Sequence, residues 1–82
     1  MNSEAAAECV QCVELLDTAS RAMGQHLRAV SRLEIARLRR ESELIPALEA
    51  VVRQASLERE SSIAAYKAHR ALHVPGISGK SA

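Results

Sequence analysis

The sequence predicts an all-α fold, an antiparallel coiled-coil hairpin of two long helices, from three observations. Apolar residues recur at helical spacing along both halves of the chain. Pro46 lacks an amide hydrogen and restricts the residue before it, which predicts a corner near residues 41–46. Residues 1–20, 21–42, 43–62 and 63–82 carry net charges of −4, +4, −2 and +3. Folding the chain at about residue 44 places each block against one of opposite sign.

The first helix is expected to begin after Ser3, a favourable N-cap residue. Its apolar stripe contains Cys9, Val13, Leu16, Met23, Leu27 and Val30, and is flanked by Cys12, Ala19 and Leu33. Gly24 costs about 1 kcal/mol relative to Ala within a helix, but the stripe keeps its register across it. We therefore expect one continuous helix. The alternative is a three-helix arrangement with a break at Gly24.

The second helix is expected to run from Pro46 to His73. Leu48, Val51, Val52 and Ala55 share one face, whereas residues 56–62 supply only one large apolar side chain, Leu57. The stripe then resumes at Ile63 and Ala64 with a shifted phase, as in a coiled-coil stutter. The sequence thus predicts a helical hairpin domain over residues 1–74, followed by a flexible tail over residues 75–82.

The phase shift predicts where a partner docks. Leu57 cannot point in the same direction as both Val52 and Ile63, so apolar surface should remain outward there. The expected partner-binding residues are Val51, Val52, Ala55, Leu57, Ile63 and Ala64. The alternative interface is the stripe between Cys9 and Val30 on the first helix.

The length of the chain predicts that it has a partner. At 82 residues, without Trp or Phe, it has little core with which to offset conformational entropy. We therefore expect a protein partner, a homo-oligomer, or both. The chain lacks a basic, apolar leader and a run long enough to span a membrane, which predicts a cytoplasmic protein.

Two cysteines and two histidines are candidate metal ligands. Cys9 and Cys12 form a CxxC pair, His69 and His73 lie four residues apart, and a hairpin brings the two pairs to similar levels. No second CxxC accompanies the first, and small apolar residues three apart also suit a helix seam. The favoured interpretation is packed cysteines with surface histidines, and thus no metal or other cofactor.

Other functional patterns are weak. Gly79, Lys80 and Ser81 resemble the end of a phosphate-binding loop, but Val74 stands where that motif needs glycine. The arginines between Arg28 and Arg40 suggest, as an alternative function, a small nucleic-acid-binding regulator. No aromatic residues interleave with them for base stacking, so we expect nucleic-acid binding to be absent. A chain this thin has little interior in which to shift a catalytic pKa, which predicts a protein without enzyme activity.

Residues 33–50 (LEIARLRRESELIPALEA), followed by a second amphipathic stretch and a loose tail, resemble the small helical-hairpin export chaperones of flagellar and type III secretion systems. The resemblance covers residues 15–74 and rests on hairpin pattern and size. It implies a cytoplasmic protein that holds an aggregation-prone secreted subunit by helix-to-helix contact. The sequence therefore predicts a protein–protein interaction module, either a secretion-type chaperone or an assembly adaptor.

Overall fold

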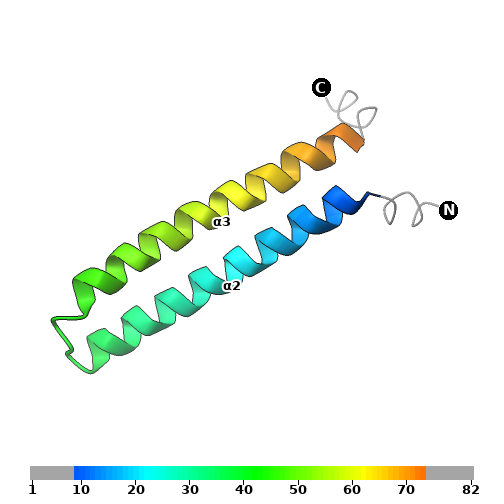
Figure 1. Ribbon diagram of the computed structural model, residues 1–82. Coiled ribbons are helices and arrows are strands. Elements are labelled where there is room, and N and C mark those ends of the chain that lie inside the picture. Colours follow the sequence, from blue (N-terminus) through cyan, green and yellow to red (C-terminus); the bar gives the residue numbers. More distant parts are fainter. Residues whose placement is uncertain (1–8, 74–82) are drawn as a thin grey trace.

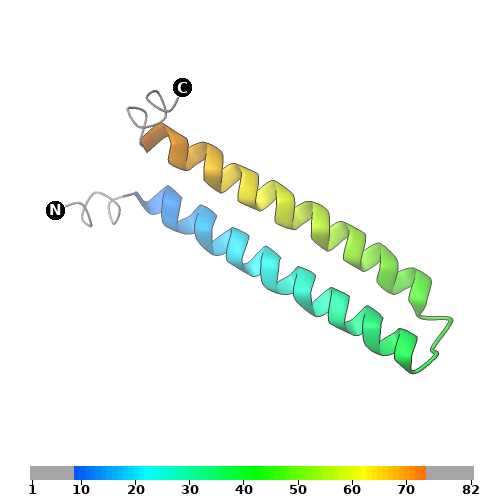
Figure 2. The ribbon, with the colours of Figure 1, turned by 180° about the vertical axis from the view of Figure 1, so that it is seen from behind.

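A computed structural model describes residues 9–73, which form two antiparallel α-helices side by side (Figure 1). Helix α2 spans Val10–Leu38 and helix α3 spans Ile45–His73. The view from behind shows the same two-helix arrangement, with the corner at one end and the far ends of both helices at the other (Figure 2). The predicted all-α hairpin is confirmed. The predicted cap at Ser3 and the predicted tail over residues 75–82 lie outside the described residues.

The corner is built by the backbone immediately after α2. The amide of Glu41 donates to the carbonyl of Ala36 at 2.9 Å, and the amide of Arg40 donates to that of Arg37 at 3.1 Å. This pair of bonds is a Schellman motif, which requires a left-handed residue at the position of Arg40. Arg40 has a φ of 58° accordingly. The turn therefore begins a little before the predicted corner, and Ile45, not Pro46, is the first residue of α3.

Helix α2 is continuous through Gly24, so the three-helix alternative is not found in the described part of the chain. A Cβ added at Gly24 would meet only the Nη1 atom of Arg28 at 3.6 Å, which is an ordinary contact. Nothing within the hairpin thus requires a glycine there. The helix begins at Val10 because Cys9 is its N-cap, with its Sγ atom accepting a hydrogen bond from the amide of Cys12 at 3.1 Å.

The two helices meet along rows whose residues are alternately three and four positions apart, the spacing of a coiled-coil seam. We call these the inner rows. All their members are buried or half-buried except His73. The inner row of α2 contains Cys12, Leu15, Ala19, Ala22, His26, Ala29, Leu33 and Ala36. The inner row of α3 contains Ile45, Leu48, Val52, Ala55, Arg59, Ser62, Tyr66, His69 and His73.

The inner row of α2 differs from the apolar stripe that was predicted from the sequence. Cys12, Ala19 and Leu33, predicted as flanking residues, lie in the seam, whereas Leu16 and Met23 are exposed. Five of the six buried apolar residues in the described part of the chain are alanines, Leu33 being the sixth. Small side chains let two helices approach closely, because the interaxial distance depends on the residues at the contact. The close approach of the two helices thus depends mainly on the buried alanines of α2.

Candidate functional site

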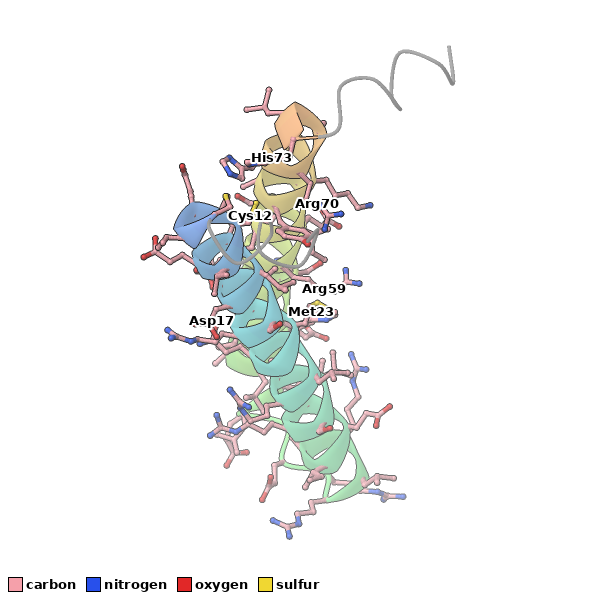
Figure 3. All side chains as sticks on the ribbon, turned by 90° about the vertical axis from the view of Figure 1, so that its right-hand side faces the viewer. Cys12, Asp17, Met23, Arg59, Arg70 and His73 are labelled. Atoms are coloured by element: carbon pink, nitrogen blue, oxygen red, sulfur yellow. The ribbon has the colours of Figure 1, made fainter. Side chains whose placement is uncertain are left out.

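Several large apolar side chains of α2 form a second row on the outside of the hairpin. Each member follows an inner-row residue by one position, so the spacing of three and four is kept. We call this the outer row, and it contains Val13, Leu16, Ser20, Met23, Leu27 and Val30. Val13, Leu16, Met23 and Leu27 are exposed, Leu27 by 67% of its surface, and Val30 is half-buried. In Figure 3, Met23 lies on the same side of the hairpin as Arg59 and Arg70, away from Asp17.

The six residues predicted to bind a partner do not share one surface. Val52 and Ala55 belong to the inner row of α3, and Ala55 is buried. The inner row continues through Arg59 and Ser62 without a change of phase, so the predicted stutter is not found. Leu57 therefore points outward as a single leucine, 61% exposed. Of the other three residues, Val51 and Ala64 are exposed and Ile63 is half-buried. Partner binding at these residues stays a prediction.

The arginines of the alternative nucleic-acid-binding prediction have two kinds of surroundings. Arg28 and Arg32 line a shallow groove between the helices together with Val51, Gln54 and Glu58 of α3. Arg37 instead forms an ion pair across the hairpin with Glu49, with 3.0 Å between its Nη2 atom and Oε2. The alternating charge blocks thus yield at least one bond between the helices. Arg32 also lines the adjoining groove together with Arg39, so these arginines follow one side of the hairpin, and nucleic-acid binding there stays the alternative prediction.

A cluster of two thiols and two imidazoles lies at the open end of the hairpin, and we call it the thiol–imidazole cluster. Its members are Cys9, Cys12, His69 and His73, whose potential ligand atoms all lie within 4.8 Å of one another. The Sγ atom of Cys9 is 3.2 Å from Nε2 of His69 and 3.3 Å from Nε2 of His73. The two Nε2 atoms are 3.1 Å apart. Cys12 and His73 lie together at this end in Figure 3.

Helix geometry explains why these four side chains meet. Residues four apart lie one above the other on a helix, so His69 and His73 project from the same side of α3. Cys9, as the N-cap, turns its Sγ atom back over the first turn of α2, towards Cys12. The sequence had placed the two pairs at similar levels, and the structure brings them into contact. The sequence did not predict that Cys9 is the N-cap of α2, because the helix was expected to begin after Ser3.

Ordinary hydrogen bonding cannot satisfy all three short contacts in this cluster. Each ring nitrogen carries either one proton or one lone pair in the plane of the ring. The Nε2 atom of His69 therefore cannot bond fully to Cys9 and to His73 at the same time, and the same applies to His73. These three atoms and the thiol of Cys12 make up a group whose atoms are close enough together to hold one metal ion.

The surroundings of Cys12 favour the protonated form of its thiol. The hydrogen bond with Cys9 is the main reason that the pKa of Cys12 is raised, and desolvation adds to the effect. The positive charge of Arg70 acts in the opposite direction on the pKa of Cys12. A cation bound within the cluster would instead favour the thiolate form, since cations stabilise neighbouring thiolates.

Among the described residues, neither helix contains an apolar stretch of the length needed to cross a lipid bilayer. Comparison of the chain with protein-family models, curated proteins and solved structures gives no match.

Proposed function

We propose that the chain is a non-catalytic protein–protein interaction module that associates with a second copy of itself through the outer row. The observation that supports this most directly is the division of side chains between the two rows of α2. Half of the inner row of α2 is alanine, while Val13, Leu16, Met23 and Leu27 remain exposed in the hairpin. Burying one such side chain contributes about 1.5–3 kcal/mol, so covering the row would add much to the stability of a small domain.

The position of the outer row around α2 fits a bundle of four helices. Successive residues of an α-helix are turned by about 100° about its axis. A row displaced by one residue from the inner row therefore faces about 100° away from α3. In a four-helix bundle with a roughly square cross-section, each helix meets its two neighbours at about this angle. α2 would thus contact α3 on one side and the α2 helix of the second copy on the other.

The pattern of the outer row favours an antiparallel contact with two-fold symmetry. The row is nearly symmetric about a point between Ser20 and Met23, so Leu16 of one copy would face Leu27 of the other.

We place this module in the cytoplasm, where a reducing environment keeps Cys9 and Cys12 as thiols. The resemblance to export chaperones supports a different occupant of the outer row, a helix of a secreted client. The self-association proposal is preferred because the outer row is nearly symmetric about its midpoint, so an antiparallel copy presents the same residues in the same order. The test described next distinguishes self-association from binding of a client helix to the same row.

The test compares two leucines of similar exposure on different surfaces. Leu27 lies in the outer row and is 67% exposed. Leu57 belongs neither to the inner row of α3 nor to the outer row of α2, and it is 61% exposed. We expect wild-type chain to sediment as a dimer at micromolar concentration. Leu27→Lys should raise the dimer dissociation constant by about tenfold or more, because it places a charge against Leu16 of the other copy. Leu57→Lys should leave it unchanged.

Circular dichroism of each variant serves as the folding control, since both substitutions lie on exposed helix positions. A wild-type chain that melts cooperatively as a monomer at these concentrations would overturn self-association and leave the outer row to a heterologous helix. An equal weakening of the dimer by Leu57→Lys would show that the effect of lysine is general and would remove the outer row as the interface.

A further inference from the structure

We propose that the thiol–imidazole cluster is a Cys₂His₂ site for Zn²⁺ that fastens the open end of the hairpin. Two ligands come from the start of α2 and two from the end of α3, so one ion would join the parts of the hairpin farthest from the corner. This inference goes beyond the proposed self-association, because it concerns a separate set of residues.

The distances within the cluster match those between the ligands of a four-coordinate zinc ion. Zn–N bonds of about 2.05 Å and Zn–S bonds of about 2.3 Å give tetrahedral edges of about 3.3 Å for N···N and about 3.6 Å for S···N. The structure has 3.1 Å between the two Nε2 atoms and 3.2 and 3.3 Å from Cys9 Sγ to them. Three edges of the tetrahedron are therefore in place to within about 0.4 Å.

Cys12 completes the set with a small adjustment. Its thiol lies within 4.8 Å of the other three ligand atoms, on the first turn of a helix whose N-cap is Cys9. Rotation of one side chain changes such a distance by more than an ångström, and a cysteine has a single χ angle to rotate. Two thiolates and two imidazoles in tetrahedral geometry favour Zn²⁺ over harder cations such as Mg²⁺ or Ca²⁺, which prefer oxygen ligands.

The binding reaction balances without any co-reactant. Each thiol loses its proton to solvent, and each neutral imidazole supplies the lone pair of its Nε2 atom. The ion brings two positive charges, and the two thiolates bring two negative charges. The cluster therefore becomes neutral, and the crowded contacts between Cys9, His69 and His73 are replaced by four bonds to one centre.

The position of the site explains what a bound ion would do. The inner row of α3 changes from apolar residues near the corner to Arg59, Ser62, Tyr66 and the two histidines near the open end. The opposing row of α2 has mostly small residues there, such as Ala19 and Ala22. Packing along this half of the seam thus provides little stabilisation. An ion that links Cys9 to His69 closes a long loop of chain, for which cross-links have their largest entropic effect.

The experiment titrates reduced, metal-free, full-length chain with Co²⁺ and then with Zn²⁺. We expect one Co²⁺ per chain, with the visible absorption of a four-coordinate ion and thiolate-to-metal charge-transfer bands, both of which disappear when Zn²⁺ displaces it. Cys12→Ser and His69→Ala should each weaken Co²⁺ binding by about tenfold or more, because each removes a ligand. The matched control is His26→Ala, a half-buried histidine of the same seam far from the cluster, which should bind as the wild type does.

The folded state of each variant is followed by circular dichroism, and His73→Ala supplies a second histidine variant if His69→Ala loses its helices. Absence of saturable binding by the wild type would overturn the proposal. Equal binding by a His69→Ala/His73→Ala double variant would also overturn it, because the CxxC pair alone would then be responsible. Half an ion per chain would show a bridge between copies rather than a clamp, and would overturn it too.

The outcome of the metal titration does not depend on whether the self-association proposal is correct. The outer-row variant Leu27→Lys retains all four ligands, and the ligand variants leave the outer row intact. If Leu27→Lys is monomeric and still binds one ion, the clamp stands without the dimer. If the ligand variants remain dimeric and bind no ion, the dimer stands without the clamp.

Discussion

Arg40 adopts the least favourable backbone conformation in the hairpin for its residue type. Its φ of 58° lies in the left-handed region, which costs a residue with a Cβ atom about 1–2 kcal/mol. The Schellman motif at the end of α2 nevertheless requires this conformation. We expect Arg40→Gly to stabilise the hairpin by about 0.5–1 kcal/mol, as part of the gain is offset by the greater freedom of glycine in the unfolded chain. Urea unfolding measures the change.

The matched control for this prediction is the adjacent arginine. Arg39, the C-cap residue of α2, has a φ of −87°, which residues with a Cβ atom adopt readily, so Arg39→Gly should destabilise the hairpin by up to about 1 kcal/mol. Both substitutions remove one positive charge at the corner, and their difference therefore isolates the backbone effect. Destabilisation of similar size by both variants would contradict the left-handed assignment of Arg40.

Residues of the candidate metal site could be named from the sequence, but their contact could not. The spacing of Cys9 and Cys12, and of His69 and His73, indicated two pairs at similar levels of a hairpin. Whether the pairs face each other depends on the rotation of each helix about its axis, and this rotation is fixed by packing along the whole seam. The seam that the structure shows includes Cys12 and both histidines, whereas the stripe chosen from the sequence did not include Cys12.

Helix α2 shows why amphipathic periodicity predicts a helix more reliably than its orientation. Two rows with the same spacing run along it, one of mostly small residues and one of large residues. Hydrophobicity favours the large row as the buried face. Close approach of two backbones favours the small row, and in this hairpin the small row is the one that contacts α3. The two helices and the corner were thus predictable, while the identity of the buried face was not.

The antiparallel contact proposed for the outer row can be tested by a charge pair. With Leu16 of one copy opposite Leu27 of the other, neither Leu16→Glu nor Leu27→Lys should dimerise well alone, because each would bury charges against leucine. A mixture of the two variants should form a heterodimer, in which one Glu–Lys contact and one Leu–Leu contact replace the two unfavourable ones. Native mass spectrometry distinguishes the three dimers by mass.

The control mixture combines Leu16→Glu with Leu57→Lys. Leu57 lies on the outer side of α3, so its lysine should not restore association with the glutamate of the other chain. A parallel α2–α2 contact would place each outer-row residue opposite itself. Mixing Leu16→Glu with Leu16→Lys would then restore the heterodimer more strongly than the 16–27 pair, which would contradict the antiparallel register.

At the scale of the whole molecule, the hairpin is held unevenly along its length. Near the corner, Leu33 and Ala36 are buried, Leu48 and Val52 lie in the opposing row, and Arg37 pairs with Glu49. Towards the open end the seam contains mainly small or polar residues, among them Arg59 and Ser62 of α3. Apolar burial is the main source of stability in a domain of this size, so local opening should begin at the open end.

Amide hydrogen exchange of metal-free chain should therefore show graded protection. Residues of both helices near the corner, around Leu33 and Val52, should exchange most slowly, and residues around Leu15 and Tyr66 should exchange faster. Addition of Zn²⁺ should slow exchange chiefly at the open end, because the ion joins the first turn of α2 to the last turn of α3. The His69→Ala variant should keep the graded pattern with and without Zn²⁺. Uniform protection along the metal-free helices would contradict the uneven seam, and an equal effect of Zn²⁺ at Leu33 and Leu15 would show that the ion does not act as a local clamp.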